Sequence, residues 1–273
     1  SGDCAANGQI TLVPGDAKTC TINNDDIAPT LTLVKTVTND NGGTKVVADF
    51  PLFIDGVAAT SGTAYPVSAN ALHTATETTQ TGYTASVWGG DCASGGTITL
   101  QPGDAKTCTI TNDDQPGTLI VKKTVVNNDG GALTPPDFSF QVNGGTATPF
   151  EADGQNDLTV NAGTYTVTEP AMAGYDTNMV NCPPNLVVPN GGSATCTIIN
   201  NDRPGKLIVI KTVVNDNGGT LTPPDFSFQV NGGPVTPFEP DGQNNFPVNA
   251  GTYTVTEPAV PGYATTYSNC ANL

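Results

Sequence analysis

Basic residues are scarce in this sequence. Nine lysines and arginines face 25 aspartates and glutamates, which gives a formal net charge of −16 over 273 residues. Binding to DNA or RNA needs clusters of basic side chains that contact phosphates, so this charge balance argues against a nucleic-acid partner. An excess of carboxylates is compatible with divalent cations and favours solubility.

Long apolar runs are missing as well. No stretch approaches the roughly 20 apolar residues of a membrane-spanning helix, so we expect no membrane insertion in this segment. No N-terminal targeting signal is visible, so we expect that the targeting segment of a secreted protein was removed or lies outside this chain. His73 is the one histidine, and no pattern is typical of a catalytic triad or a phosphate-binding loop, so we do not expect an enzyme with turnover.

Turn-forming residues are abundant instead. The chain holds 31 glycines and 22 prolines beside many threonines, valines and asparagines, and no segment shows a helical period. This composition is typical of short strands joined by tight turns. The sequence therefore predicts an all-β protein.

The sequence repeats itself with a period of 88 residues. The motifs "LVKTVTNDNGG", "VKKTVVNNDGG" and "VIKTVVNDNGG" place Lys35, Lys123 and Lys211 at this spacing. The motifs "KTCTINND", "KTCTITND" and "ATCTIINN" do the same for Cys20, Cys108 and Cys196. A fixed period of this kind indicates a tandem array of similar units.

The repeat divides the chain into four parts. Residues 27–114 and 115–202 are complete repeats, residues 1–26 match only the C-terminal part of one, and residues 203–273 match a repeat without its last strand. One interpretation is a window from a longer array. The other is a subunit whose segment 1–26 completes the last domain of a neighbouring copy by strand addition. Both make the partners further repeats or copies of the chain, arranged head to tail.

Each repeat reads as short alternating segments separated by glycine, proline and asparagine turns. In residues 115–202 the seven segments are "GTLIVKKTVV", "DFSFQV", "TATPF", "DLTVNA", "TYTVTE", "YDTNMV" and "ATCTIIN". This pattern predicts a seven-stranded, Ig-like Greek-key β-sandwich. The linkers "NDDQPG" and "NNDRPG" are short and contain proline, so we expect a stiff array of domains.

Six of the seven cysteines form pairs with similar separations. The separations are 16 residues for Cys4 and Cys20, 16 for Cys92 and Cys108, and 14 for Cys182 and Cys196. We expect a disulfide in each pair, with a stabilisation of about 3 kcal/mol, and hence an oxidising compartment. Cys270 corresponds to Cys182, and its partner falls beyond residue 273. The alternative, metal binding, lacks CxxC spacing and a recurring histidine.

Strand alternation points one lysine, one glutamate and one asparagine of each complete repeat toward the core. In residues 115–202 the shared faces are Leu119, Val121 and Lys123 in the first strand, Tyr165, Val167 and Glu169 in a middle strand, and Cys196, Ile198 and Asn200 in the last strand. Unpaired charges in a sandwich core cost several kcal/mol. Their recurrence at matching places therefore indicates a shared purpose.

The segment "GTYTVTEPAMAGY" at 163–175 resembles the signature of Cna B-type, prealbumin-like (SpaA-like) domains of bacterial surface proteins. The strands "LIVKKT" and "CTIINN" also fit that family, and the resemblance covers every repeat. It implies a prealbumin-like fold in which a first-strand lysine often bonds covalently to a last-strand asparagine or aspartate, with the glutamate as catalyst. The implied sets are Lys35, Asn112 and Glu77; Lys123, Asn200 and Glu169; Lys211 and Glu257, whose asparagine lies beyond the chain; and Asn24, an acceptor whose segment holds no first-strand lysine.

The chemistry of such a site is intelligible from its side chains. Burial favours the neutral amine of lysine, which is a nucleophile. A buried glutamate is expected to stay protonated, so that it polarises the asparagine amide and shuttles a proton while ammonia leaves. Each site reacts once, so this is self-processing.

Three simpler alternatives stay open. The lysine and glutamate form only a buried ion pair, Lys123 turns outward and Lys122 takes its place, or the disulfide alone supplies the clamp. The first repeat departs from the pattern, because His73 stands where the other repeats have Tyr165 and Tyr253, and its glutamate follows the lysine four residues sooner.

Calcium is a candidate ligand of the asparagine-rich loops. The motifs "NDNGG" and "NNDGG" hold Asp40, Asp129 and Asp216, and calcium prefers such oxygen ligands. The full alternation of acids of an EF-hand is missing, and Asn-Gly and Asp-Gly are ordinary turn pairs. We otherwise expect no cofactor.

The first functional hypothesis is structural. It is a load-bearing segment of an extracellular fibre or cell-surface stalk, built from β-sandwiches that are locked by disulfides and, as the resemblance implies, by Lys–Asn isopeptide bonds. The alternative is an adhesin whose repeats bind a host or surface ligand. Loops that differ between repeats favour the alternative, and "WGGDCASGG" at 88–96 differs moderately from "NCPPNLVVPNGG" at 181–192.

Overall fold

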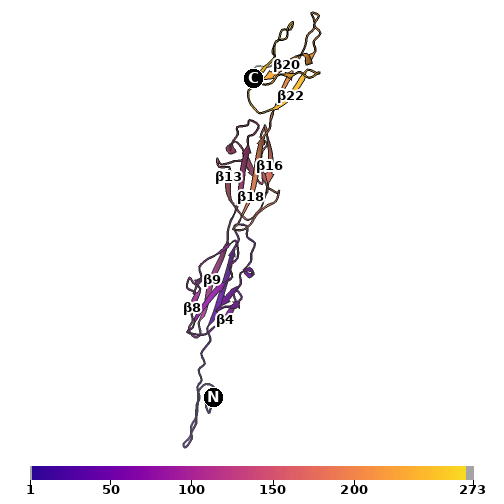
Figure 1. The fold of residues 1–273 in the computed structure, drawn as a ribbon. Helices are drawn as coiled ribbons and strands as arrows, with labels where there is room; N and C mark the ends of the chain where they lie inside the picture. Colours follow the sequence, from indigo (N-terminus) through magenta and orange to yellow (C-terminus); the bar gives the residue numbers. More distant parts are fainter. Residues whose placement is uncertain (1, 269–273) are drawn as a thin grey trace. The chain divides into compact units, whose positions relative to one another are not determined.

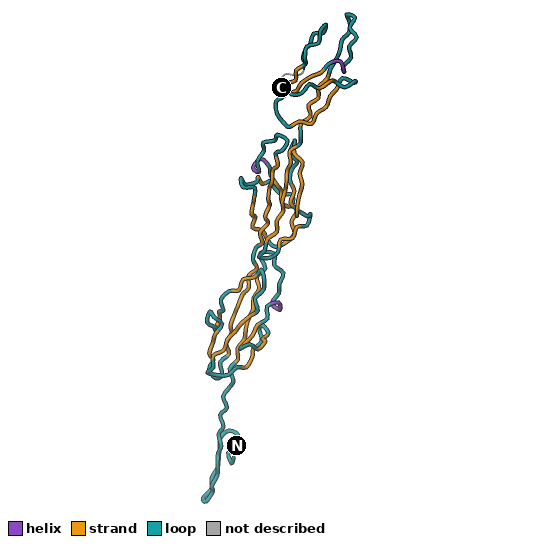
Figure 2. The backbone as a smooth tube through the Cα atoms, viewed as in Figure 1, coloured by secondary structure: helices purple, strands orange, loops and turns teal. Residues whose placement is uncertain are grey.

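The computed structural model describes residues 2–268, and strands and loops make up nearly all of them (Figure 2). The helical elements in this range are single 3-10 turns, η1 (Val47–Asp49), η2 (Pro135–Asp137) and η3 (Pro223–Asp225). The prediction of an all-β protein is confirmed. Within the described part of the chain, no helix has the length and apolar character needed to cross a membrane.

Two compact units partition the described residues. The first holds residues up to Gly117 together with the short segments 159–163 and 188–192, and the second holds the remaining residues.

The first sandwich extends from Thr30 to Asp114. Its strands are β1 (Thr30–Thr38), β2 (Leu52–Ile54), β3 (Val57–Ala59), β4 (Ala64–Pro66), β5 (Leu72–Glu77), β6 (Tyr83–Ala85), β7 (Gly89–Gly90), β8 (Thr97–Thr99) and β9 (Ala105–Asp114). One sheet has the order β4-β1-β9-β6, with β7 also paired to β9, and the other has the order β3-β2-β5-β8. The core between them includes Leu31, Leu33, Leu52, Trp88, Leu100 and Ile110.

The second sandwich repeats this plan. Its strands are β10 (Gly117–Val126), β11 (Ser139–Val142), β12 (Thr148–Pro149), β13 (Gln155–Val160), β14 (Gly163–Tyr165), β15 (Val167–Thr168), β16 (Tyr175–Val180), β17 (Leu186–Val188) and β18 (Ser193–Asp202). The main sheet has the order β13-β10-β18-β16, and Figure 1 shows its labelled strands side by side. Facing it are the shorter groups β12-β11-β15 and β14-β17.

The strand count of this sandwich differs from the prediction in two places. The predicted segment 164–169 is divided into β14 and β15, because the backbone N–H of Thr166 donates to the side chain of Asn143 at 2.8 Å instead of to a neighbouring strand. The sequence prediction also missed β17, which is only three residues long and is followed by proline.

The third domain has fewer strands in the described range. They are β19 (Gly205–Ile210), β20 (Ser227–Val230), β21 (Thr236–Pro237), β22 (Gln243–Val248) and β23 (Val255–Thr256). Its core contains Val209, Phe226, Phe228 and Phe238. Strand β19 pairs with β22, and its other edge has no partner within residues 2–268.

Residues 2–29 contain no named strand. One isolated bridge joins Gly2 to Cys20, and nearly all of the side chains in this stretch are exposed. Its sequence matches the last part of a repeat, yet it has no sandwich core of its own.

Candidate functional site

The first and last strands of each complete sandwich are parallel neighbours. In the second sandwich Val125 on β10 is opposite Asn200 on β18, and Lys123 lies two positions before Val125. Side chains two positions apart on a strand share a face, so Lys123 and Asn200 project to the same side of the sheet. The pairing of β1 with β9 places Lys35 and Asn112 in the same relationship.

The site of the second sandwich joins three buried side chains. The Nζ atom of Lys123 donates to Oε1 of Glu169 and to Oδ1 of Asn200. The side chains of Lys123 and Glu169 are 0% and 1% exposed. The amine lies over the rings of Phe138, at 3.9 Å from the centroid, and Phe150, at 5.3 Å. An aromatic wall of this kind excludes water and leaves the amine few polar partners.

Thr177 on β16 completes this network, and the sequence analysis did not identify it. Its hydroxyl donates to Oε2 of Glu169 at 3.1 Å and accepts a hydrogen bond from Nδ2 of Asn200 at 3.2 Å. Thr177 is directly opposite Asn200 in the antiparallel ladder of β16 and β18. The signal that would have identified it is its register, because an exposed threonine in a strand carries no chemical signature by itself.

The first sandwich holds the same trio with fewer hydrogen bonds. Nζ of Lys35 donates to Oδ1 of Asn112 and forms an ion pair with Oε2 of Glu77 at 2.9 Å. Apart from that ion pair, neither oxygen of Glu77 has a hydrogen-bond partner among the described residues. The ring of Phe50 lies 4.7 Å from the amine. The residue opposite Asn112 on β6 is Ala85, which has no hydroxyl.

The third domain holds two members of the trio. Nζ of Lys211 donates to both oxygens of Glu257, at 2.7 and 2.9 Å, and lies 3.9 Å from the ring centroid of Phe226. The corresponding asparagine would follow residue 273. Asn24, the predicted acceptor of the N-terminal segment, is exposed and lies outside any sandwich.

Burial changes the acidity of the two lysines whose sites are complete. Desolvation lowers the pKa of Lys123 below its ordinary value, against the opposing effect of Glu169. It also lowers the pKa of Lys35, against the opposing effect of Glu77. A lowered pKa increases the share of neutral amine, which is the nucleophilic form. The outward orientation considered for Lys123 is excluded by its burial.

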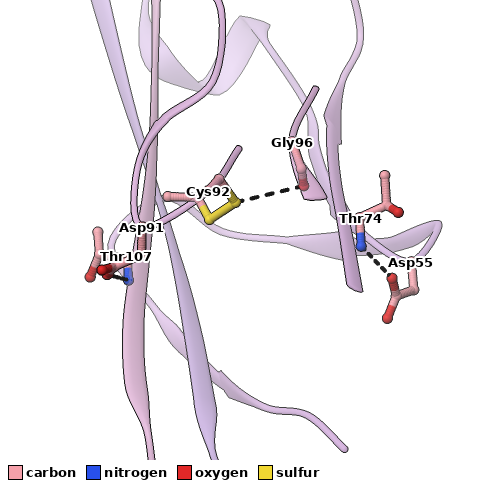
Figure 3. Close-up of a disulfide and its surroundings, with 7 residues drawn as sticks. Asp55, Thr74, Asp91, Cys92, Gly96 and Thr107 are labelled. Atoms are coloured by element: carbon pink, nitrogen blue, oxygen red, sulfur yellow. Dashed lines mark hydrogen bonds between the residues drawn. A yellow bond between two sulfur atoms is a disulfide. The ribbon is translucent and has the colours of Figure 1, made fainter. Parts of the chain in front are cut away.

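Three disulfides are present, and they connect Cys4 with Cys20, Cys92 with Cys108, and Cys182 with Cys196. These are the pairs expected from the spacing, and Cys270 lies outside the described residues. Figure 3 shows the Cys92 disulfide, where Cys92 also contacts the carbonyl of Gly96. Cys92 lies between β7 and β8, and Cys108 lies on β9, so this bond does not reach β1.

The asparagine-rich loops wrap around a carboxylate at the end of the last strand. The backbone N–H groups of Asp40, Asn41 and Gly43 donate to Asp114 at 2.5 to 3.0 Å. The hydroxyl of Tyr83 closes the loop by donating to Asn39 and accepting from the backbone N–H of Lys45.

The second sandwich has the same arrangement around Asp202, with donors from Asn128, Asp129 and Gly131. These loops therefore anchor the last strand, a role that the sequence analysis missed.

This geometry bears on the calcium candidates. Carboxylate oxygens of Asp40, Asp113 and Asp114 lie within 4.8 Å of one another. The backbone donors around Asp114 occupy lone pairs that a cation would use. The corresponding N–H of Asp129 donates to Asp202, and the side chain of Asp216 accepts from Asn217. Calcium at Asp40, Asp129 and Asp216 stays a prediction.

His73 has a structural environment of its own. It is buried, with Nδ1 2.6 Å from a carboxylate oxygen of Asp55 and Nε2 2.8 Å from the carbonyl oxygen of Ser68. Both partners are acceptors, so the charged imidazole donates to each of them. The hydrogen bond that His73 donates to Asp55 raises the pKa of His73, with a further contribution from the hydrogen bond to the carbonyl of Ser68. His73 lies 38 residues after Lys35 in sequence, and none of the described contacts joins it to Lys35, Glu77 or Asn112.

Comparison with known proteins identifies one family for all three domains. The family model described as "Prealbumin-like fold domain" matches residues 26–110, 114–198 and 202–273. Among solved structures, the Bacillus anthracis TIE protein is similar at 19% identity with a TM-score of 0.55. The match covers 89% of this chain and 48% of that one, so this chain spans about half the length of the TIE protein structure. It bears on the fold alone.

Two further structures are similar to this chain at lower TM-scores. Two B repeat units of the collagen binding protein of Staphylococcus aureus match at 18% identity, over 88% of this chain and 71% of theirs, with a TM-score of 0.27. The Streptococcal ancillary pilin matches at 15% identity, over 89% and 93%, with a TM-score of 0.27. A comparison with curated proteins gave no match.

Proposed function

The chain belongs to the prealbumin-like fold domain family, and on that premise we propose that it is a load-bearing segment of an extracellular fibre or cell-surface stalk. In this proposal its sandwiches are locked by disulfides and by isopeptide bonds, Lys35 to Asn112 and Lys123 to Asn200. The protein is no enzyme with turnover, because each bond forms once. Its partners are further repeats or copies of itself.

The observation that carries the proposal is the parallel pairing of the two terminal strands with the trio between them. The N-terminal end of β10 and the C-terminal end of β18 lie at opposite ends of one ladder that pairs nine positions. Tension on the chain therefore shears all of its hydrogen bonds together. A covalent bond between Lys123 and Asn200 would carry this load directly.

The neutral amine of Lys123 attacks Cγ of Asn200, the Nζ–Cγ bond forms, and the Cγ–Nδ2 bond breaks. One proton moves from Nζ to Nδ2, so ammonia leaves. Glu169 contacts Nζ and is the group that accepts and returns the proton.

The test is the intact mass of the fully reduced and denatured chain. We expect it to be lower than the sequence mass by one ammonia for each bond, with peptide mapping to identify the joined residues. The matched variant Glu169→Gln keeps the shape of the side chain and is expected to restore the ammonia of the Lys123–Asn200 site alone. A wild-type chain with its full sequence mass contradicts isopeptide formation.

The open edge of β19 bears on assembly. That edge corresponds to the one that β18 covers on β10, and Ile208 and Ile210 on β19 are 47% and 67% exposed. The following part of a longer chain, or residues 18–25 of a second copy, would cover it. In the second case Asn24 would reach Lys211, and the chain would form covalent oligomers that survive reduction and boiling. Asn24→Ala would abolish them.

An adhesin is the second candidate function, and one cavity favours it. A cavity of about 420 Å³ in the first sandwich is lined by Ile54, Val57, Tyr65, Val67 and His73. If the repeats bind a ligand, an immobilised glycan or matrix protein should retain the full chain, and the variant Val57→Glu should no longer be retained. If the wild-type chain and Val57→Glu are retained equally, or if neither is retained, binding through this cavity is contradicted.

A further inference from the structure

Thr177 occupies the space between the catalyst and the leaving group of the proposed reaction. Its hydroxyl is 3.1 Å from Oε2 of Glu169 and 3.2 Å from Nδ2 of Asn200, the nitrogen that leaves as ammonia. The other oxygen of Glu169 contacts Nζ of Lys123. A closed path of hydrogen bonds therefore leads from the attacking nitrogen to the leaving nitrogen.

We propose that Thr177 is a catalytic residue that relays the proton from Glu169 to the leaving nitrogen of Asn200. The inference rests on the proposed isopeptide function and extends it to a residue of β16.

The hydroxyl of Thr177 is needed because the attacking nitrogen, Nζ of Lys123, loses a proton while the leaving nitrogen, Nδ2 of Asn200, gains one. In the reacting pair Lys123 is neutral and Glu169 carries a proton on Oε2, a state that differs from the ion pair by the position of one proton. Attack of Nζ makes Cγ of Asn200 tetrahedral, which frees a lone pair on Nδ2, and the hydroxyl of Thr177 then turns its proton from Oε2 toward Nδ2. Oε2 passes its proton to Oγ1 of Thr177, Oγ1 passes its own to Nδ2, and Oε1 accepts the proton that Nζ loses. Glu169 ends with one proton, as it began, and ammonia departs.

The same hydroxyl also orients the amide before reaction. Because Nδ2 donates to Thr177, Oδ1 is directed toward the amine of Lys123, and Cγ is presented to the nucleophile. Thr177 is exposed on the outer side, so ammonia has a route to solvent beside it.

The first sandwich is a natural comparison within the same chain. At the position opposite Asn112 it has Ala85, and both oxygens of Glu77 lack hydrogen-bond partners other than the ion pair with Lys35. The relay predicts that the Lys123–Asn200 bond forms faster than the Lys35–Asn112 bond. The third domain has Thr265 at the corresponding sequence position.

The experiment follows bond formation in the full chain during refolding. Protein from denaturant is refolded under oxidising conditions and quenched in acid at timed intervals, and the fraction of each joined peptide is measured by mass spectrometry. Thr177→Val keeps the shape and removes the hydroxyl, and Thr177→Ser restores it. Thr168→Val, at an exposed position next to Glu169, is the matched control.

We expect Thr177→Val to slow the Lys123–Asn200 reaction by about tenfold or more, since a positioned proton-transfer group contributes about 10²–10⁴-fold to a rate and Glu169 stays in place. Thr177→Ser and Thr168→Val are expected to react within a few-fold of wild type, and Ala85→Thr is expected to accelerate the Lys35–Asn112 reaction. Wild-type speed in Thr177→Val, or a serine variant as slow as the valine variant, overturns the relay. If the wild-type chain forms neither the Lys35–Asn112 bond nor the Lys123–Asn200 bond, the proposed isopeptide function itself is wrong. This outcome is measured on the wild-type chain, so it is distinct from any result with a Thr177 variant.

Discussion

Lys123 and Asn200 are 77 residues apart in the chain and meet across the parallel strands β10 and β18. The disulfide of the same sandwich joins Cys182, in the loop after β16, to Cys196 on β18. It therefore ties the last strand to a middle loop and leaves the first strand free. A disulfide placed in this way does not resist separation of the two terminal strands, so the amine and the amide are the groups placed to do so.

Removal of a buried lysine should destabilise the first sandwich strongly. Lys35→Met removes the amine of the proposed bond to Asn112 and leaves the carboxylate of Glu77, 5% exposed, without the group that it pairs with. We expect a loss of about 3–5 kcal/mol in the free energy of unfolding, the usual effect of an unpaired buried charge. Trp88 is the only tryptophan and lies in this core, so its fluorescence during urea unfolding reports on this sandwich specifically.

The control is the double variant Lys35→Met/Glu77→Leu, which removes both charges. It should recover part of the loss, since the buried charge is no longer unpaired. A single variant with the wild-type urea midpoint would show that neither the contact of Lys35 with Glu77 nor a bond to Asn112 stabilises this sandwich measurably.

The stability of the first sandwich should fall as the pH rises above the ordinary pKa of histidine, about 6.5. The hydrogen bond that His73 donates to the carboxylate of Asp55 raises the pKa of His73 above its ordinary value. A group with a raised folded pKa stabilises fully below its unfolded pKa, about 6.5 for histidine, and the stabilisation is lost as the pH rises through the folded pKa. The urea midpoint of Trp88 fluorescence, measured across this range, should decline. In His73→Gln and Asp55→Asn that decline should disappear; its persistence in both would assign it to another group.

The stabilisation provided by the loop around Asp114 should be lost in acid. Burial raises the pKa of the Asp114 carboxyl, but hydrogen bonds from Gly43, Asn41 and Asp40 oppose this and hold the pKa below its ordinary value. The resulting stabilisation is present above the unfolded pKa, about 3.9, and is lost as the pH falls through the lower folded value. Asp114→Ala should cost about 2–3 kcal/mol at neutral pH, since hydrogen bonds to a charged group are lost.

Asp113→Ala removes the same charge at an exposed neighbour and should change stability by less than about 0.5 kcal/mol. Equal losses in the two variants would mean that net charge, not the loop, is responsible. Repeating both measurements in calcium and in EDTA tests the calcium hypothesis, which requires a higher urea midpoint with the ion.

Strand alternation was sufficient to predict that Lys123, Glu169 and Asn200 point inward, because the period of two is imposed by the backbone itself. That β10 and β18 are parallel neighbours depends on sheet topology, which alternation does not encode. Thr177 was missed for the same reason, since its role follows from its position opposite Asn200 and not from its type. The loops around Asp114 and Asp202 were interpreted as turns or calcium loops, because a sequence does not show that backbone donors converge on a distant carboxylate.

Force applied to the ends of the chain should distinguish the bonded from the unbonded sandwich. With Lys123 joined to Asn200, the 77 residues between them stay out of tension, which withholds about 270 Å of extended chain. In Glu169→Gln the two terminal strands separate by shear and the sandwich extends. The length of chain released should be less than that of the whole segment by the 14 residues that the Cys182–Cys196 disulfide closes, about 50 Å. Reductant should then add that length to the variant and nothing to the wild type. A single-molecule trace in which wild type and variant extend equally contradicts the covalent clamp, whereas equal extension of the variant with and without reductant contradicts only the position of the disulfide.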